Sequence, residues 1–243
     1  MSGLKENYSA IDRRIREACA RAGRSPEDIR LIWVSKNQPR EKILEALSLG
    51  ARYFGENRVQ EAGDKFPLPA GPSDGTFPAY ALHFIGRLQT NKIRKVLPLA
   101  AAIHSIDSID LLAATDRVAG ELELVRDVFL QVNTSRETAK GGFAPETLVE
   151  ILRTLTPPRH LRIVGLMTMG PTNGNSATTR ACFHELAGLF QEIRREPRNT
   201  EALRNLRWLS MGMTGDFETA IEEGAHFLRI GTGLFGERPV ALG

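Results

Sequence analysis

The chain has 243 residues, of which 42% are hydrophobic, and a formal net charge of +3 at pH 7. This composition suits one large globular domain, and α/β barrels often reach this length as a single domain. The most basic window, residues 86–95, is best explained as one solvated helix face, and no apolar run is long enough to span a bilayer, so we expect neither a nucleic-acid partner nor a membrane association.

The N-terminal segment predicts a helix over residues 2–23, because apolar residues recur there at helical spacing. Charges such as Glu6 and Asp12 interrupt any signal-peptide core. Cys19 and Cys182 lie in helical patterns without a disulfide or metal spacing, and the sequence has no HExxH motif. We therefore expect a cytoplasmic protein without a metal site.

Short apolar segments alternate with helical patterns along the rest of the chain. Eight strands are predicted, at residues 31–36, 52–55, 81–86, 101–107, 127–133, 161–169, 206–212 and 225–231. The helices between them are predicted at residues 39–50, 56–66, 90–100, 107–120, 145–155, 176–195 and 216–224.

This alternation favours a single (β/α)8 barrel domain over residues 1–243, since such barrels typically have about 250 residues. An open doubly wound sheet is the alternative, but the first strand–helix turn lacks the GxGxxG motif of its dinucleotide-binding form. Residues 67–80 contain four prolines and two glycines. We interpret them as a mobile loop inserted before the third strand, not as a domain linker, because the alternation resumes unchanged.

Lys36 ends the first predicted strand, after the apolar residues 31–34. Functional sites of such barrels lie at this end of the strands. If Lys36 points inward, desolvation would lower the pKa of its amine, and a neutral amine can form a Schiff base with a carbonyl compound. The alternative is that Lys36 is simply the first polar residue of the loop, with its amine in water. Its position alone leaves both interpretations open.

The loops after the seventh and eighth predicted strands are rich in glycine, and barrels frequently bind phosphate at these two places. The loops read SMGMTGD (210–216) and RIGTG (229–233). Glycine lets backbone N–H groups approach an anion, and Ser210, Thr214 and Thr232 can add hydroxyl donors. Either loop alone could be a tight turn, but the two together predict a phosphate site.

Arg229 lies between the apolar Leu228 and Ile230 on the eighth predicted strand, where a buried arginine needs a partner. That partner is either a carboxylate, such as Glu56 or Asp216, or an acceptor on a ligand, such as a ring nitrogen. A lysine, a phosphate cradle and an arginine that faces a ring together suggest pyridoxal 5′-phosphate (PLP) held as an internal aldimine.

Seven motifs resemble those of the pyridoxal phosphate homeostasis proteins, the YggS/PROSC family. They are VSK (34–36), FGENRVQE (54–61), HFIGRLQTNK (83–92), IHSID (103–107), GLMTM (165–169), LSMGMTGDFETAI (209–221) and RIGTGLFGER (229–238). The resemblance covers nearly the whole chain and implies a barrel like the N-terminal domain of alanine racemases, with PLP as the cofactor. The cofactor-binding residues that it implies are Lys36 for the aldimine, Asn57 as a polar neighbour, Arg229 facing the pyridine nitrogen, and Ser210, Thr214, Gly231 and Thr232 around the phosphate.

The sequence departs from the family pattern in small ways. Thr214 stands where the family more often has serine, which keeps the hydroxyl, and Gly215 precedes Asp216 where the family commonly has an acidic pair. The segment 67–80 is longer than expected. None of these departures removes a group that is needed to hold PLP.

Three functions are compatible with this pattern. The first is a PLP-binding protein that buffers or delivers the cofactor without robust catalysis, with PLP-dependent apo-enzymes as partners. The second is a PLP-dependent amino-acid racemase, and the third is a Schiff-base enzyme such as an aldolase that acts on a phosphorylated sugar without PLP. The racemase is disfavoured because the sequence ends at Gly243, without the β-domain whose tyrosine serves the second substrate face in alanine racemases.

Two further expectations follow from the sequence. We expect a monomer, because no apolar interface stripe is visible. We also expect the competing lysines to be weaker candidates than Lys36 for the aldimine, since they fall in helical patterns or, for Lys140, in a loop; they are Lys42, Lys65, Lys92, Lys95 and Lys140.

Overall fold

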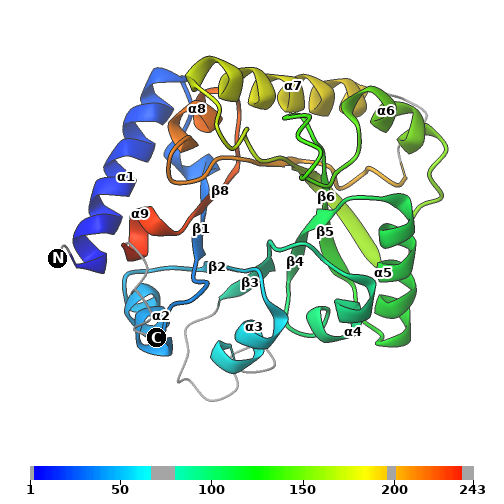
Figure 1. Ribbon diagram of the computed structural model, residues 1–243, viewed down its shortest axis with the longest axis horizontal. Helices are drawn as coiled ribbons and strands as arrows, with labels where there is room; N and C mark the ends of the chain where they lie inside the picture. Colours follow the sequence, from blue (N-terminus) through cyan, green and yellow to red (C-terminus); the bar gives the residue numbers. More distant parts are fainter. Residues whose placement is uncertain (1–2, 67–79, 196–200, 237–243) are drawn as a thin grey trace.

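The computed structural model describes residues 3–66, 80–195 and 201–236, and its strands close into one parallel barrel (Figure 1). In barrel order the strands are β1 (Arg30–Val34), β2 (Tyr53–Glu56), β3 (Ala81–Phe84), β4 (Ala102–Ile106), β5 (Arg126–Gln131), β6 (Leu161–Met167), β7 (Trp208–Ser210) and β8 (Phe227–Ile230). Pairing of β1 with β8, from Arg30 opposite Phe227 to Trp33 opposite Ile230, closes the barrel. The predicted (β/α)8 barrel is therefore confirmed, and the open-sheet alternative was wrong.

Both faces of the strands are mostly apolar because each face meets a packed layer. One set of side chains fills the barrel interior, among them Ile32, Phe129 and Phe227, while the alternate residues pack under the helices. Such filling by alternate strand residues is the usual core of this fold. The strand ends are consequently the place where polar side chains from several loops can meet.

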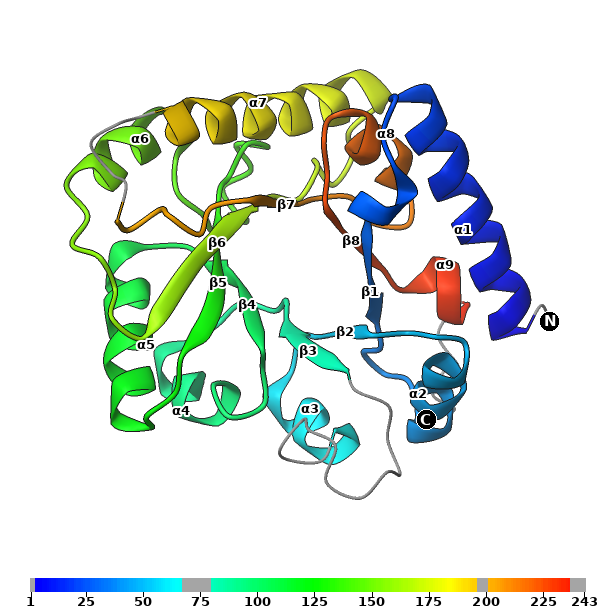
Figure 2. The same cartoon turned by 180° about the vertical axis from the view of Figure 1, so that it is seen from behind.

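Helices surround the barrel on its outside, as the view from behind shows (Figure 2). They are α1 (Leu4–Arg21), α2 (Arg40–Ser48), α3 (Val59–Lys65), α4 (Ile93–Val96), α5 (Ile109–Glu121), α6 (Pro145–Arg153), α7 (Ser176–Arg195), α8 (Phe217–Glu222) and α9 (Thr232–Phe235), with 3-10 turns at Pro26–Asp28 and Thr90–Lys92. The N-terminal helix α1 packs against α8 and α9, the helices that precede and follow β8 (Figures 1 and 2). Across the described ranges, no helix has the length and apolar content to cross a bilayer.

Some element boundaries differ from the prediction. The helix predicted at 90–100 is a 3-10 turn followed by the short α4, because Pro98 cannot continue a helix. The helix predicted at 2–23 ends at Arg21, with Gly23 at φ +63° just beyond it. The short helix α9 was not predicted at all. The predicted loop 67–80 lies outside the described residues, except for Tyr80.

Candidate cofactor site

A cavity of about 470 Å³ opens at the carboxyl ends of the strands. All eight strands, or the loops that follow them, contribute residues to its wall. Its volume lies within the range of about 300–1,000 Å³ that is usual for small-molecule sites. The residues predicted from the sequence that line it are Lys36, Asn57, Thr214, Arg229, Gly231 and Thr232.

Lys36 lies two residues after Val34, the last residue of β1, so it follows the interior-facing residues of that strand. Ile32 and Val34 point into the barrel, and Val34 and Lys36 both line the cavity. Lys36 is half-buried, and its amine has no hydrogen-bond or ion-pair partner among the residues that the structure describes. The interpretation of Lys36 as an inward-facing lysine therefore fits better than that of a loop lysine held in bulk water.

Arg229 forms part of the cavity wall although it is only 5% exposed. Its Nη1 donates to Ser210 Oγ at 2.7 Å, and its Nη2 donates to the Thr168 carbonyl at 2.8 Å. Burial lowers the pKa of Arg229 to about 10, so the guanidinium remains charged at neutral pH. Of the two partners that the sequence left open for Arg229, the carboxylate is not found as a contact ion pair among the described residues: Glu56 pairs with Lys65 instead, and Asp216 attracts Arg229 without contact.

Ser210 is fully buried and does not line the cavity, although the sequence placed it at the phosphate. Its hydroxyl accepts from Arg229 and lies 2.9 Å from His104 Nδ1. His104 Nε2 in turn lies 2.7 Å from His83 Nδ1 in the barrel interior. Burial lowers the pKa of His83 to about 3 and that of His104 well below its usual value, so both rings are neutral at neutral pH. Ser210 thus orients Arg229 from below the cavity.

The loops after β7 and β8 are tied together at the predicted phosphate position. Thr232 Oγ1 donates to Thr214 Oγ1 at 3.2 Å, and the Gly233 N–H donates to the same oxygen at 3.2 Å. Gly231 caps α9, whose first N–H groups have no acceptor within the helix and therefore favour an anion. A Cβ on Gly231 would lie 3.3 Å from the Val34 carbonyl oxygen, so this residue brings two loops into close approach.

Asn57 and Gly86 show the same kind of approach on the other side of the cavity. Asn57 is exposed at the cavity wall after β2. A Cβ on Gly86, which follows β3, would lie 2.3 Å from the Asn57 carbonyl oxygen. Gly86 therefore allows the two loops to meet, a role that its motif did not reveal.

The sequence interpretation missed Lys140, which also lines the cavity. Its Nζ donates to the Gly170 carbonyl at 2.6 Å and pairs with Glu137 at 2.7 Å. Gln131 and Met169, at the ends of the fifth and sixth strands, were missed as well. Their position at strand ends was the available signal, since every strand end of this barrel reaches the cavity.

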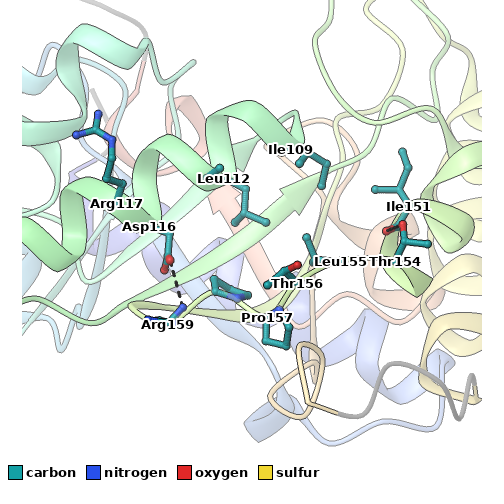
Figure 3. A pocket seen from close by; sticks show the side chains of 12 residues that line it. Ile109, Leu112, Asp116, Arg117, Ile151, Thr154, Leu155, Thr156, Pro157 and Arg159 are labelled. Atoms are coloured by element: carbon teal, nitrogen blue, oxygen red, sulfur yellow. Dashed lines mark hydrogen bonds between the residues drawn. The ribbon is translucent and has the colours of Figure 1, made fainter.

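A second, larger hollow of about 610 Å³ lies in the outer helical layer, between α5 and the segment 151–159 (Figure 3). Its wall is mostly apolar, with Ile109, Leu112 and Pro157 among its residues. The carboxylate of Asp116 accepts a hydrogen bond from the backbone N–H of Arg159 at 3.2 Å. The lining residues of this hollow do not form a set of groups suited to catalysis or to cofactor binding. The strand-end cavity is therefore the candidate site.

Comparison with known proteins identifies the family. Residues 7–239 match the family "Alanine racemase, N-terminal domain". A relative from Aquifex aeolicus named pyridoxal phosphate homeostasis protein is 40% identical over 96% of this chain and 97% of its own, and one from Escherichia coli with the same name is 33% identical over 98% of both. PipY of Synechococcus elongatus, solved with PLP bound, has a TM-score of 0.76 and 36% identity over 91% of this chain and all of its own.

More distant structures share the fold alone. Alanine racemase of Clostridium difficile has a TM-score of 0.71 at 13% identity, covering 98% of this chain and 57% of the racemase.

Proposed function

The chain belongs to the family of pyridoxal phosphate homeostasis proteins, and we propose that it binds PLP in the strand-end cavity through a Schiff base with Lys36. In that step the Lys36 nitrogen bonds to the aldehyde carbon, and the aldehyde oxygen leaves as water with the two protons of the neutral amine. Bound PLP would supply a conjugated ring that withdraws electrons from an attached imine.

The observation that carries this proposal is the placement of one unpartnered amine among groups suited to the rest of the cofactor. Lys36 shares its cavity with Arg229, which can donate toward a ring nitrogen. Thr214, Gly231 and Thr232 line the same cavity and suit a phosphate. PipY, with PLP bound in its solved structure, supports the same cofactor here.

We propose that the role is to buffer PLP or to deliver it to PLP-dependent apo-enzymes, and that the protein has no robust catalysis of its own. The names of the relatives, pyridoxal phosphate homeostasis proteins, support this role. We further propose a single domain over residues 1–243 that acts as a monomer in the cytoplasm. The free, buried Cys19 and Cys182 suit a reducing compartment.

Borohydride reduction tests the site. Purified protein incubated with PLP should turn yellow, lose that absorption band on reduction, and carry the pyridoxyl group on Lys36 in a peptide map. Lys36→Ala should remove most of the label from that peptide, while the control Lys95→Ala, outside the cavity, should keep it. Protein that remains colourless with added PLP would contradict the proposal and favour a Schiff-base enzyme without PLP.

A further inference from the structure

Lys36 sits in a turn whose conformation is held from outside the cavity. β1 ends at Val34, and Asn37 has φ +59°, a left-handed conformation that asparagine tolerates better than most residues. Ser35, just before Lys36, is fully buried. Its N–H donates to the Gly55 carbonyl at 3.1 Å, which continues the pairing with β2.

The two peptide groups on either side of Lys36 are bound by side chains from α3. Lys65 Nζ donates to the Ser35 carbonyl at 2.6 Å, which fixes the peptide before Lys36. Glu61 accepts from the Asn37 N–H, which fixes the peptide after it. Lys65 and Glu61 also pair with each other across one turn of α3.

Glu56, at the end of β2, completes this group. Its Oε1 accepts from Ser35 Oγ at 2.7 Å and from Lys65 Nζ at 3.0 Å. Glu56 is fully buried, and its Oε2 has no hydrogen-bond partner among the described atoms. Desolvation accordingly raises the pKa of Glu56, against the opposing effects of Ser35 and Lys65.

Stability alone does not explain why the chain buries these charges. A buried ion pair is often no more stabilising than apolar residues of the same shape, because desolvation offsets the attraction. What an apolar replacement could not do is bind a carbonyl and an N–H at the same time. All three charged side chains act directly or through Ser35 on the backbone that carries Lys36.

We propose that Lys65, Glu61 and Glu56 form a clamp that positions Lys36, by fixing the backbone on both sides of it so that its amine points at the bound aldehyde. The inference rests on the proposed function. These are positioning residues: the cavity wall does not include them, so they affect the cofactor through Lys36. A misdirected amine should slow bond formation to the aldehyde without removing the pocket in which the ring and phosphate lie.

Two ligands distinguish a loss of Lys36 positioning from general damage to the binding pocket. PLP reports on Schiff-base formation through its absorption band, and pyridoxine 5′-phosphate, which lacks the aldehyde, reports on the pocket alone. We expect Lys65→Met to slow Schiff-base formation by about 10- to 100-fold, the cost of a small misplacement of a reacting group, and to keep the parental affinity for pyridoxine 5′-phosphate. The control is Lys42→Met, which removes a half-buried lysine paired with Glu45 on α2, outside the cavity, and should match the parent.

Glu61 provides a second test if Lys65→Met does not fold. Glu61→Ala should slow Schiff-base formation in the same way, and Glu61→Gln, which keeps an acceptor for the Asn37 N–H, should restore most of the rate. Parental rates in Lys65→Met and Glu61→Ala would overturn the clamp, as would an equal loss of affinity for both ligands. A parent protein that carries no pyridoxyl label on Lys36 would instead contradict the proposed function itself.

Discussion

Arg229 is a buried cation whose hydrogen bonds in the barrel go to neutral partners. Ser210 and the Thr168 carbonyl hold its two terminal nitrogens, and this fixes the plane of the guanidinium at the cavity wall. The pKa of about 10 leaves it protonated at neutral pH. A fixed cation at this wall would disfavour protonation of a ring nitrogen beside it.

Replacing Ser210 by alanine distinguishes an orienting role from a phosphate contact. We expect the affinities for PLP and for phosphate-free pyridoxal to fall by the same factor, because the lost hydroxyl acts through Arg229 on the ring. Leaving Arg229 and His104 without this partner should also lower the free energy of unfolding by about 1–3 kcal/mol, measured by urea denaturation. Thr214→Val is the matched comparison and should weaken PLP but spare pyridoxal. Selective loss of PLP affinity in Ser210→Ala would return Ser210 to the phosphate site.

The alternation of side chains explains why Ser210 lies below the cavity beside Arg229, although the sequence assigned it to the phosphate. Trp208 and Phe227 point into the barrel, so Ser210 and Arg229, each two residues later, share that interior face. We predicted strands that include both residues, but assigned the serine to the loop because of the glycines that follow it. The contacts of Ser210 with His104, 106 residues away, depend on barrel closure and are not visible in local spacing.

At the scale of elements, the phosphate position depends on how closely the end of β8 approaches β1. Gly231→Val should weaken PLP binding more than Thr232→Ala, because the new side chain would press on the Val34 carbonyl, which a Cβ alone would approach to 3.3 Å. Thr232→Ala removes one hydrogen bond to a charged group, at a cost of about 1.5–3 kcal/mol in binding free energy. Absorbance titrations with PLP measure both. Gly188→Ala on α7 is the control, since a Cβ there meets nothing within 4 Å and Gly188 does not line the cavity. A Gly231→Val protein with parental affinity would show that close backbone approach is not required.

Long and short elements differed in how well they could be predicted. The strands were found because both of their faces are buried, which produces continuous apolar runs. The four-residue helices α4 and α9 are too short to establish a helical period, so one was predicted too long and the other was missed. Lys140 lines the cavity from the loop after β5, and its bond to the Gly170 carbonyl, 30 residues away, depends on the assembled barrel.

At the scale of the whole molecule, the cavity draws on every strand end but offers few groups for acid–base catalysis. Among its described lining residues are two amines, those of Lys36 and Lys140, one carboxylate, that of Asp107, and no tyrosine. The amine of Lys140 is engaged by Gly170 and Glu137. Tyr8 packs on Trp33, and Tyr53 contacts His83 within the barrel, so neither replaces a catalytic tyrosine.

We therefore predict that the protein does not racemise amino acids efficiently. Racemisation removes a proton from one face of the substrate carbanion and returns one to the other, which requires two acid–base groups. Lys36 could serve one face, whereas Lys140 is held by its partners, and the Arg229 cation would weaken the ring as an electron sink. Holo protein incubated with L- and D-alanine or serine in deuterated water should show little α-proton exchange by NMR and little inversion by chiral chromatography. Turnover in the usual enzyme range of about 1–1,000 per second would refute this prediction and establish a racemase, with Lys140 as the first residue to replace in the search for its second base.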